Sequence, residues 1–113
     1  MNQLSGKFDV TIARKKYKCH LSMNAFRLLC EKEDLDFNEM QKWMNKNTLV
    51  AVPKIIYYGI VNNAYFKNED VSELPSLEFM SAHILEDMDS LEDYSNKIAI
   101  AFGGEDPEEE GKK

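Results

Sequence analysis

Two short segments near the start of the chain show a strict alternation of apolar and polar side chains. Their apolar positions are Phe8, Val10, Ile12, Tyr17, Cys19 and Leu21. A period of two is typical of strands that bury one face, so the segments predict a β-hairpin. Ala13-Arg14-Lys15 between them lacks the Asn-Gly pair that favours a tight turn, which predicts a longer or looser loop.

The pattern then changes to the helical period, with residues that can cap helices. Ser22 precedes an apolar stripe and predicts a helix over residues 23–33, which such a cap stabilises by about 1 kcal/mol. Asp36 and Glu39 have the spacing of a capping box, which predicts a second helix over 37–45. The polar residues that follow predict a turn.

Residues 49–66 form the most hydrophobic segment of the chain. Its length and the recurrence of its apolar positions favour a helix that is buried on most sides. Pro53 is expected in the first turn of this helix, where no amide donor is needed. Gly59 costs about 1 kcal/mol inside a helix compared with alanine, so another helix is expected to cross closely there.

Two further helices are expected near the end of the chain. Ser76 predicts a cap for a helix over 77–88, and either Asp89 or Ser90 predicts a cap for a helix over 91–102. Gly103-Gly104 is typical of a helix end.

The whole pattern predicts one globular domain over residues 1–102 and a disordered acidic tail or linker over 103–113, which has no apolar side chain. The expected fold class is α+β but mostly α. It consists of an N-terminal β-hairpin followed by a bundle of about five helices.

The composition indicates the cellular environment in which the protein is expected. The 113 residues contain two cysteines, too few for a disulfide framework, and no apolar run near the ~20 residues that span a bilayer. The first residues lack the apolar core of a secretory signal. We therefore expect a cytoplasmic protein in a reducing environment without membrane contact.

The net charge of −6 is unevenly distributed. Residues 1–30 carry six basic side chains and one acid, whereas residues 67–93 carry nine acids and one lysine. This asymmetry suits head-to-tail self-association or docking on a basic partner. The only basic cluster is the small one around Arg14, which predicts a solvated hairpin tip rather than a nucleic-acid site.

Motifs for catalysis or cofactor binding are not found in the sequence. It contains no glycine-rich phosphate loop, nucleophile elbow or HExxH. Cys19, His20, Cys30 and His83 have no spacing typical of a metal site, and neighbours on a strand face opposite ways. The paired acids near the end predict a solvated surface. We expect no enzyme, cofactor or metal.

The best candidates for a partner-binding surface lie on the second expected helix. They are Phe37, Met40, Trp43 and Met44. Methionine adapts to different partners, and tryptophan is enriched among residues that dominate binding energies. The same residues are also compatible with the core, which is favoured for Phe37 and Met40 and evenly balanced for Trp43 and Met44.

The order of elements resembles the tail assembly chaperones of long-tailed bacteriophages. The residues that carry the resemblance lie in a hairpin that leads into a helix, in a capped second helix, and in a Tyr-Gly step of a buried helix. They are Val10-Thr11-Ile12, Lys16, Tyr17, Leu21, Met23-Asn24-Ala25-Phe26-Arg27, Leu35-Asp36-Phe37 and Tyr57-Tyr58-Gly59, followed by the acidic block 69–93.

The resemblance implies a binding role that is not enzymatic. Members of the family act in the host cytoplasm during tail assembly and are absent from the mature virion. They coat the tape measure protein, and an extended product of ribosomal frameshifting recruits tail tube subunits. For this chain, the resemblance implies a tape measure protein and a tail tube protein as partners, together with self-association. Gly111-Lys112-Lys113 is compatible with codons of a slippery site.

An alternative of a different class is an acidic inhibitor or DNA mimic from a mobile element. It would bind a basic protein partner through the acidic block 69–93.

Overall fold

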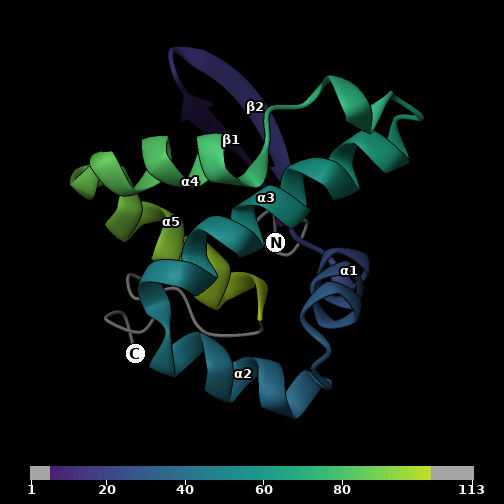
Figure 1. Cartoon of the computed structure of the whole chain (residues 1–113), viewed down its shortest axis with the longest axis vertical. Coiled ribbons are helices and arrows are strands. Elements are labelled where there is room, and N and C mark those ends of the chain that lie inside the picture. Colours follow the sequence, from purple (N-terminus) through teal and green to yellow (C-terminus); the bar gives the residue numbers. More distant parts are fainter. Residues whose placement is uncertain (1–5, 103–113) are drawn as a thin grey trace, which may run out of the picture.

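The computed structural model describes residues 6–102 and shows a hairpin followed by helices (Figure 1). Within this part of the chain, strands β1 (Lys7–Ile12) and β2 (Lys15–His20) precede five α-helices. The helices are α1 (Met23–Glu33), α2 (Phe37–Lys46), α3 (Thr48–Phe66), α4 (Leu77–Glu86) and α5 (Met88–Ala101), with a short 3-10 helix η2 (Val71–Glu73) before α4. The predicted fold class is confirmed, whereas the expected tail over 103–113 lies outside the described residues.

The hairpin is tighter than the sequence predicts. The strands pair antiparallel from Lys7 with His20 to Ile12 with Lys15, so only Ala13 and Arg14 form the turn. Both have positive φ angles, 52° and 71°, as a type I′ turn requires. The expectation of a longer loop was wrong. Strand pairing and the burial of Val10 and Ile12 hold Ala13 and Arg14 at positive φ angles, although residues of these types disfavour them.

Helix α3 is the centre of the fold. It packs against β2 and against α1, α2, α4 and α5, so its side chains are buried on most sides as predicted. Figure 1 shows α3 crossing the middle of the molecule between the hairpin and α2. The core formed around it includes Leu29, Met40, Ile55, Ile56, Met80 and Ile84.

Two expectations for α3 were wrong. The helix begins at Thr48, so Pro53 is its sixth residue and lies beyond the first turn. The hydrogen bond that proline cannot donate would reach the carbonyl of Leu49, so this bond is missing from the helix. The close approach at Gly59 is real, but the neighbour is strand β2 rather than a helix.

The caps agree with the sequence at two helices and differ at two others. Asp36 and Glu39 form the predicted capping box of α2, and the Ser76 hydroxyl accepts the predicted bond from the Phe79 amide. Ser22 precedes α1 but makes no side-chain cap. Asp87, rather than the predicted Asp89 or Ser90, caps α5. Asp87 is also the single residue between α4 and α5.

Helix α4 therefore ends at Glu86, two residues before the predicted end, and α5 begins three residues earlier than predicted. A single residue, Asn47, likewise separates α2 from α3, where the sequence predicts a turn over 45–48. These short connections are found because the carboxylate of Asp87 and the backbone of Asn47 satisfy the free amides and carbonyls at the helix ends.

Candidate protein-binding site

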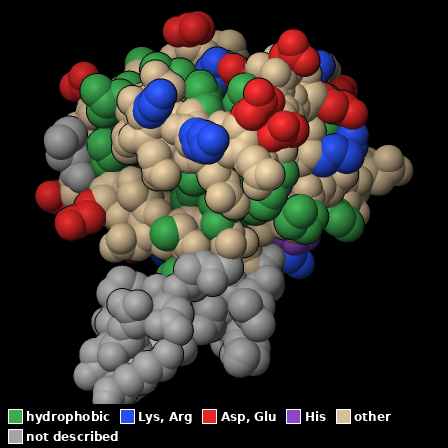
Figure 2. Space-filling view, turned by 90° about the horizontal axis from the view of Figure 1, so that it is seen from below, with side chains coloured by type: hydrophobic (Ala, Val, Ile, Leu, Met, Phe, Trp, Pro, Cys, Tyr) green, Lys and Arg blue, Asp and Glu red, His purple; other side chains and the backbone are tan. Residues whose placement is uncertain are grey.

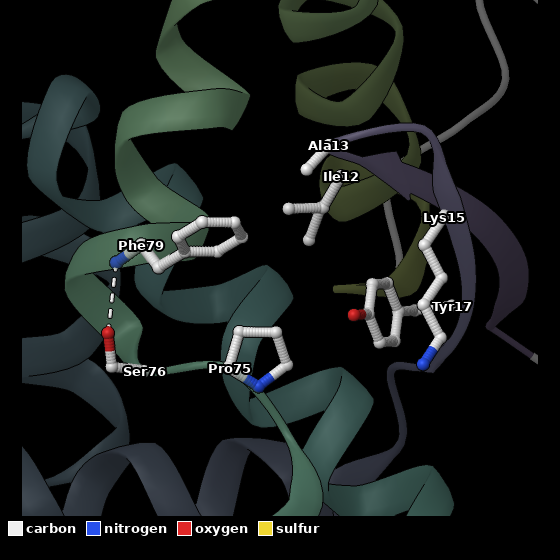
Figure 3. Close-up of a pocket in the computed structure, with 7 residues that line it drawn as sticks. All are labelled: Ile12, Ala13, Lys15, Tyr17, Pro75, Ser76 and Phe79. Atoms are coloured by element: carbon white, nitrogen blue, oxygen red, sulfur yellow. Dashed lines mark hydrogen bonds between the residues drawn. The ribbon is translucent and has the colours of Figure 1, made fainter.

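An apolar hollow of about 420 Å³ opens between the hairpin and the start of α4 (Figure 3). The residues that line it are Ile12, Ala13, Lys15, Tyr17, Pro75, Ser76 and Phe79. We call it the tip hollow. Figure 3 shows the rings of Tyr17 and Phe79 facing each other across the gap, with Pro75 at one end and Ile12 and Ala13 at the other.

The positions of the two rings follow from the strand and the helix that carry them. Tyr17 lies on the inward-facing side of β2 near the turn, where it is half-buried. The ammonium nitrogen of Lys15 lies 5.4 Å from the centre of its ring. Phe79 is held in the first turn of α4 by the bond of its amide to the Ser76 hydroxyl, at 3.1 Å. Its side chain remains 44% exposed and packs against His83 at 4.6 Å between ring centroids. Such exposed rings beside a hollow are suited to contact with an apolar partner.

This site is not predicted by the sequence pattern. The predicted inward face of α4 is a stripe that includes Met80 and Ile84, and both are buried. Phe79 falls outside that stripe, and a large aromatic side chain on the outward face of a helix was the available signal. The position of α4 beside the hairpin tip could not be deduced from the pattern, because it depends on the connection over residues 67–76.

Of the four predicted partner-binding residues on α2, three are exposed or half-buried and one, Met40, is buried. Met40 is fully buried, so it belongs to the core and is not available to a partner. Phe37 is 39% exposed, but its ring packs with Phe26 at 6.5 Å and with Phe102 at 5.9 Å. These rings join α2 to α1 and to the residue that follows α5.

Trp43 and Met44 are half-buried. The Lys54 ammonium lies 5.9 Å from the centre of the Trp43 ring and binds the Glu33 carboxylate at 3.0 Å. Met44 lines a separate hollow of about 160 Å³ between the α2–α3 corner and α5. A contact of these two side chains with a partner stays a prediction.

The surface charges follow the sequence at the hairpin and at the last two helices. Arg14, Lys15, Lys16 and Lys18 are exposed around the tip, and Asp9 pairs with Lys18 at 2.7 Å, which lowers the pKa of the Asp9 carboxyl. All nine acids between residues 69 and 93 are exposed. On the face that Figure 2 shows, acidic and basic side chains are nevertheless interspersed.

Three findings bear on chemistry. Among residues 6–102, no group of three or more His, Cys, Asp and Glu side chains is placed to hold a metal ion. Burial raises the pKa of the Cys19 thiol, which donates to the Ile56 carbonyl at 3.6 Å, so this thiol stays protonated and unreactive at neutral pH. None of the described helices is long and apolar enough to cross a membrane.

His20 predicts how stability depends on pH. Burial, and secondarily the charge of Lys7, lower the pKa of His20, and its Nδ1 is buried without a hydrogen-bond partner in the described part of the chain. The unfolded chain therefore binds a proton more readily than the folded one. Stability should be full above the unfolded pKa of about 6.5 and should fall as the pH drops through that value.

Urea denaturation between pH 5 and 8 measures this effect. His20→Gln should remove the loss of stability between pH 7 and 5.5, whereas His83→Gln, on the exposed side of α4, should retain it. The shifted carboxyls Asp9, Asp70 and Asp87 have lowered pKa values and titrate below this window. An unchanged pH profile in His20→Gln would contradict the assignment.

Comparison with known proteins finds no matching family model, no matching curated protein and no matching solved structure.

Proposed function

We propose that this protein is a tail assembly chaperone of a long-tailed bacteriophage, without enzymatic activity, that binds the tape measure protein. In the same role it would help to recruit tail tube subunits in the host cytoplasm and be absent from the mature virion. The observation that supports the proposal most is the order of elements, in which a tight hairpin leads directly into α1 and α2 and then into the buried α3 with its Tyr-Gly step.

The tip hollow supplies a surface for this role. A tape measure protein is long and helical in the family that the chain resembles, and an amphipathic helix buries its apolar face in a groove. Tyr17 and Phe79 provide apolar area, and Lys15 provides a charge at the rim. Tyrosine and other aromatic side chains are enriched at the centre of such contacts.

Co-expression with a tape measure protein tests the proposal. We expect the two proteins to purify together and the tape measure protein to become soluble. Tyr17→Ser combined with Phe79→Ser should weaken the complex at least tenfold. The matched control is Leu49→Ser, which removes a 66% exposed side chain from the first turn of α3, outside the tip hollow. A strictly monomeric protein without affinity for the tape measure protein would refute the proposed function.

A second candidate, an acidic inhibitor of a basic protein, is supported by the exposure of all nine acids between 69 and 93. Three of them already have partners, because Asp70 and Asp87 cap helical turns and Asp93 pairs with Lys97. Glu86→Lys with Glu92→Lys separates the two candidates. The double change should abolish binding of a basic partner but leave binding at the tip hollow intact.

A further inference from the structure

The outer edge of β2 is open for part of its length. Because the turn has two residues, Ile12 and Lys15 form the hydrogen-bonded pair that closes it, and bonded pairs then alternate along the hairpin. The backbone groups of Lys16 and Lys18 therefore point away from β1. Within residues 6–102, these groups have no hydrogen-bond partner.

Two other outward-facing backbone groups of the hairpin are occupied. On the β1 edge, the Thr11 amide donates to the Tyr94 hydroxyl at 3.4 Å. On the β2 edge, the His20 carbonyl accepts a bond from the Asn62 side chain at 2.8 Å. On β2, the open stretch thus runs from Lys16 to Lys18, near the turn, and ends at the His20 carbonyl.

A second hollow, of about 300 Å³, lies beside this open edge, and we call it the edge hollow. Its charged side chains are Lys15, Lys16, Lys18, Lys67 and Glu69. Its apolar wall comes from the end of α3 and the connection to α4, through Ile60, Ala64 and Leu74. Lys18 pairs with Asp9, and the other three lysines outnumber the one glutamate, so the edge hollow is basic. Lysines on an edge strand discourage pairing with chains that lack a complementary charge.

We propose that this edge binds an extended acidic segment of a partner protein, which adds to β2 as an antiparallel strand. The inference does not depend on the chaperone role. Main-chain bonds to Lys16 and Lys18 supply the affinity, as in other cases of strand addition. Charge complementarity with the lysines selects an acidic occupant.

The alternation of side chains defines the segment further. Residues of the added strand opposite Lys16 and Lys18 would share the outer face with these lysines, so they should be acidic. The residue between them would be opposite Tyr17 and would point toward the apolar wall of the edge hollow. The expected pattern is therefore acidic, apolar, acidic.

A fluorescent peptide of the sequence Glu-Val-Glu-Val-Glu is the probe, measured by anisotropy with the full chain. Lys16→Glu should weaken binding at least tenfold, and Lys46→Glu, an exposed lysine on α2, is the matched control that should not. Affinity should fall as salt is added. Chemical shifts of the Lys16 and Lys18 amides should move the most in NMR spectra.

Methylation of peptide amides tests the strand geometry. In an antiparallel pair, the bonded residues lie opposite each other, so the amides of the glutamates face β2 and those of the valines face away. Methylation at glutamate should abolish binding, and methylation at valine should be tolerated. Equal binding of both methylated peptides, or of a Gln-Val-Gln-Val-Gln analogue, would overturn the proposal. So would self-association of the free protein that Lys16→Glu abolishes, because a second copy would then occupy the edge.

Discussion

Replacing Gly59 with alanine is expected to lower the free energy of unfolding by about 2 kcal/mol, although alanine is the better helix former. A Cβ atom at this position would lie 2.3 Å from the Cys19 sulfur and 2.7 Å from a Leu21 methyl group, far inside ordinary contact distance. Both neighbours are buried, with exposed fractions of 0% and 2%, so neither can move into solvent.

The size of the effect is the difference between two terms. Alanine in place of glycine stabilises a helix by about 1 kcal/mol, and overpacking of a well-packed core costs about 1–3 kcal/mol and sometimes more. The sulfur is also held by its contact with the Ile56 carbonyl at 3.6 Å, so relief requires β2 to shift away from α3. Such a shift would loosen the hairpin, and we place the overpacking term at the upper end of its range.

Urea denaturation measures the change, since the midpoint should fall with an unchanged slope. Ala82→Gly on the exposed side of α4 calibrates the helix term and should cost about 1 kcal/mol. Cys19→Ala removes the sulfur, so the double variant with Gly59→Ala should be more stable than the sum of the single changes predicts. If Gly59→Ala stabilises the protein, then β2 does not approach α3 as closely as the structure shows.

The contact at Gly59 also illustrates what the sequence could predict. Strand alternation and helical stripes depend on local periodicity, so the hairpin and the helices were predicted with most boundaries near the observed ones. A glycine inside the apolar run 49–66 indicated a close approach, but nothing local indicates which element approaches. Strand β2 is brought there by tertiary packing that connects residues about 40 positions apart.

The same limit applies to the candidate site. Tyr17 was assigned to the hairpin from its alternation, and Ser76 was identified as a cap, yet their proximity across the tip hollow was not predicted. The cap of α1 shows a related failure. Ser22 has the residue type and position of an N-cap, but its hydroxyl accepts a bond from Asn62 instead, at 3.0 Å. A long-range partner thus replaced the local one that the sequence predicts.

Replacing Asn62 with alanine is expected to lower the free energy of unfolding by about 3 kcal/mol. Asn62 is a polar residue buried in the core, with an exposed fraction of 0%. Its amide donates to the His20 carbonyl at 2.8 Å and to the Ser22 hydroxyl, and its oxygen accepts from Asn24 at 2.7 Å. The variant loses these bonds, creates a cavity and leaves the His20 carbonyl without its partner.

Asn62→Asp gives a sharper test because it changes the sign of the pH dependence. An ionised carboxylate cannot donate to the His20 carbonyl, and its burial disfavours the charged form, so the pKa of the new group should rise above the unfolded value of about 3.9. The folded variant would then bind a proton more readily than the unfolded chain, and its stability would decrease as the pH rises through the folded pKa.

The matched control is Asn63→Asp, one residue further along α3, where the side chain is half-buried. This control introduces the same charge without removing the bonds to His20 and Ser22, so it should change stability by less than about 1 kcal/mol. Between pH 4 and 8, the free energy of unfolding of Asn62→Asp should decrease as the pH rises, relative to that of Asn63→Asp. Equal profiles would mean that the amide of Asn62 does not hold the junction between β2 and α1, because only a donor at that position can satisfy the His20 carbonyl.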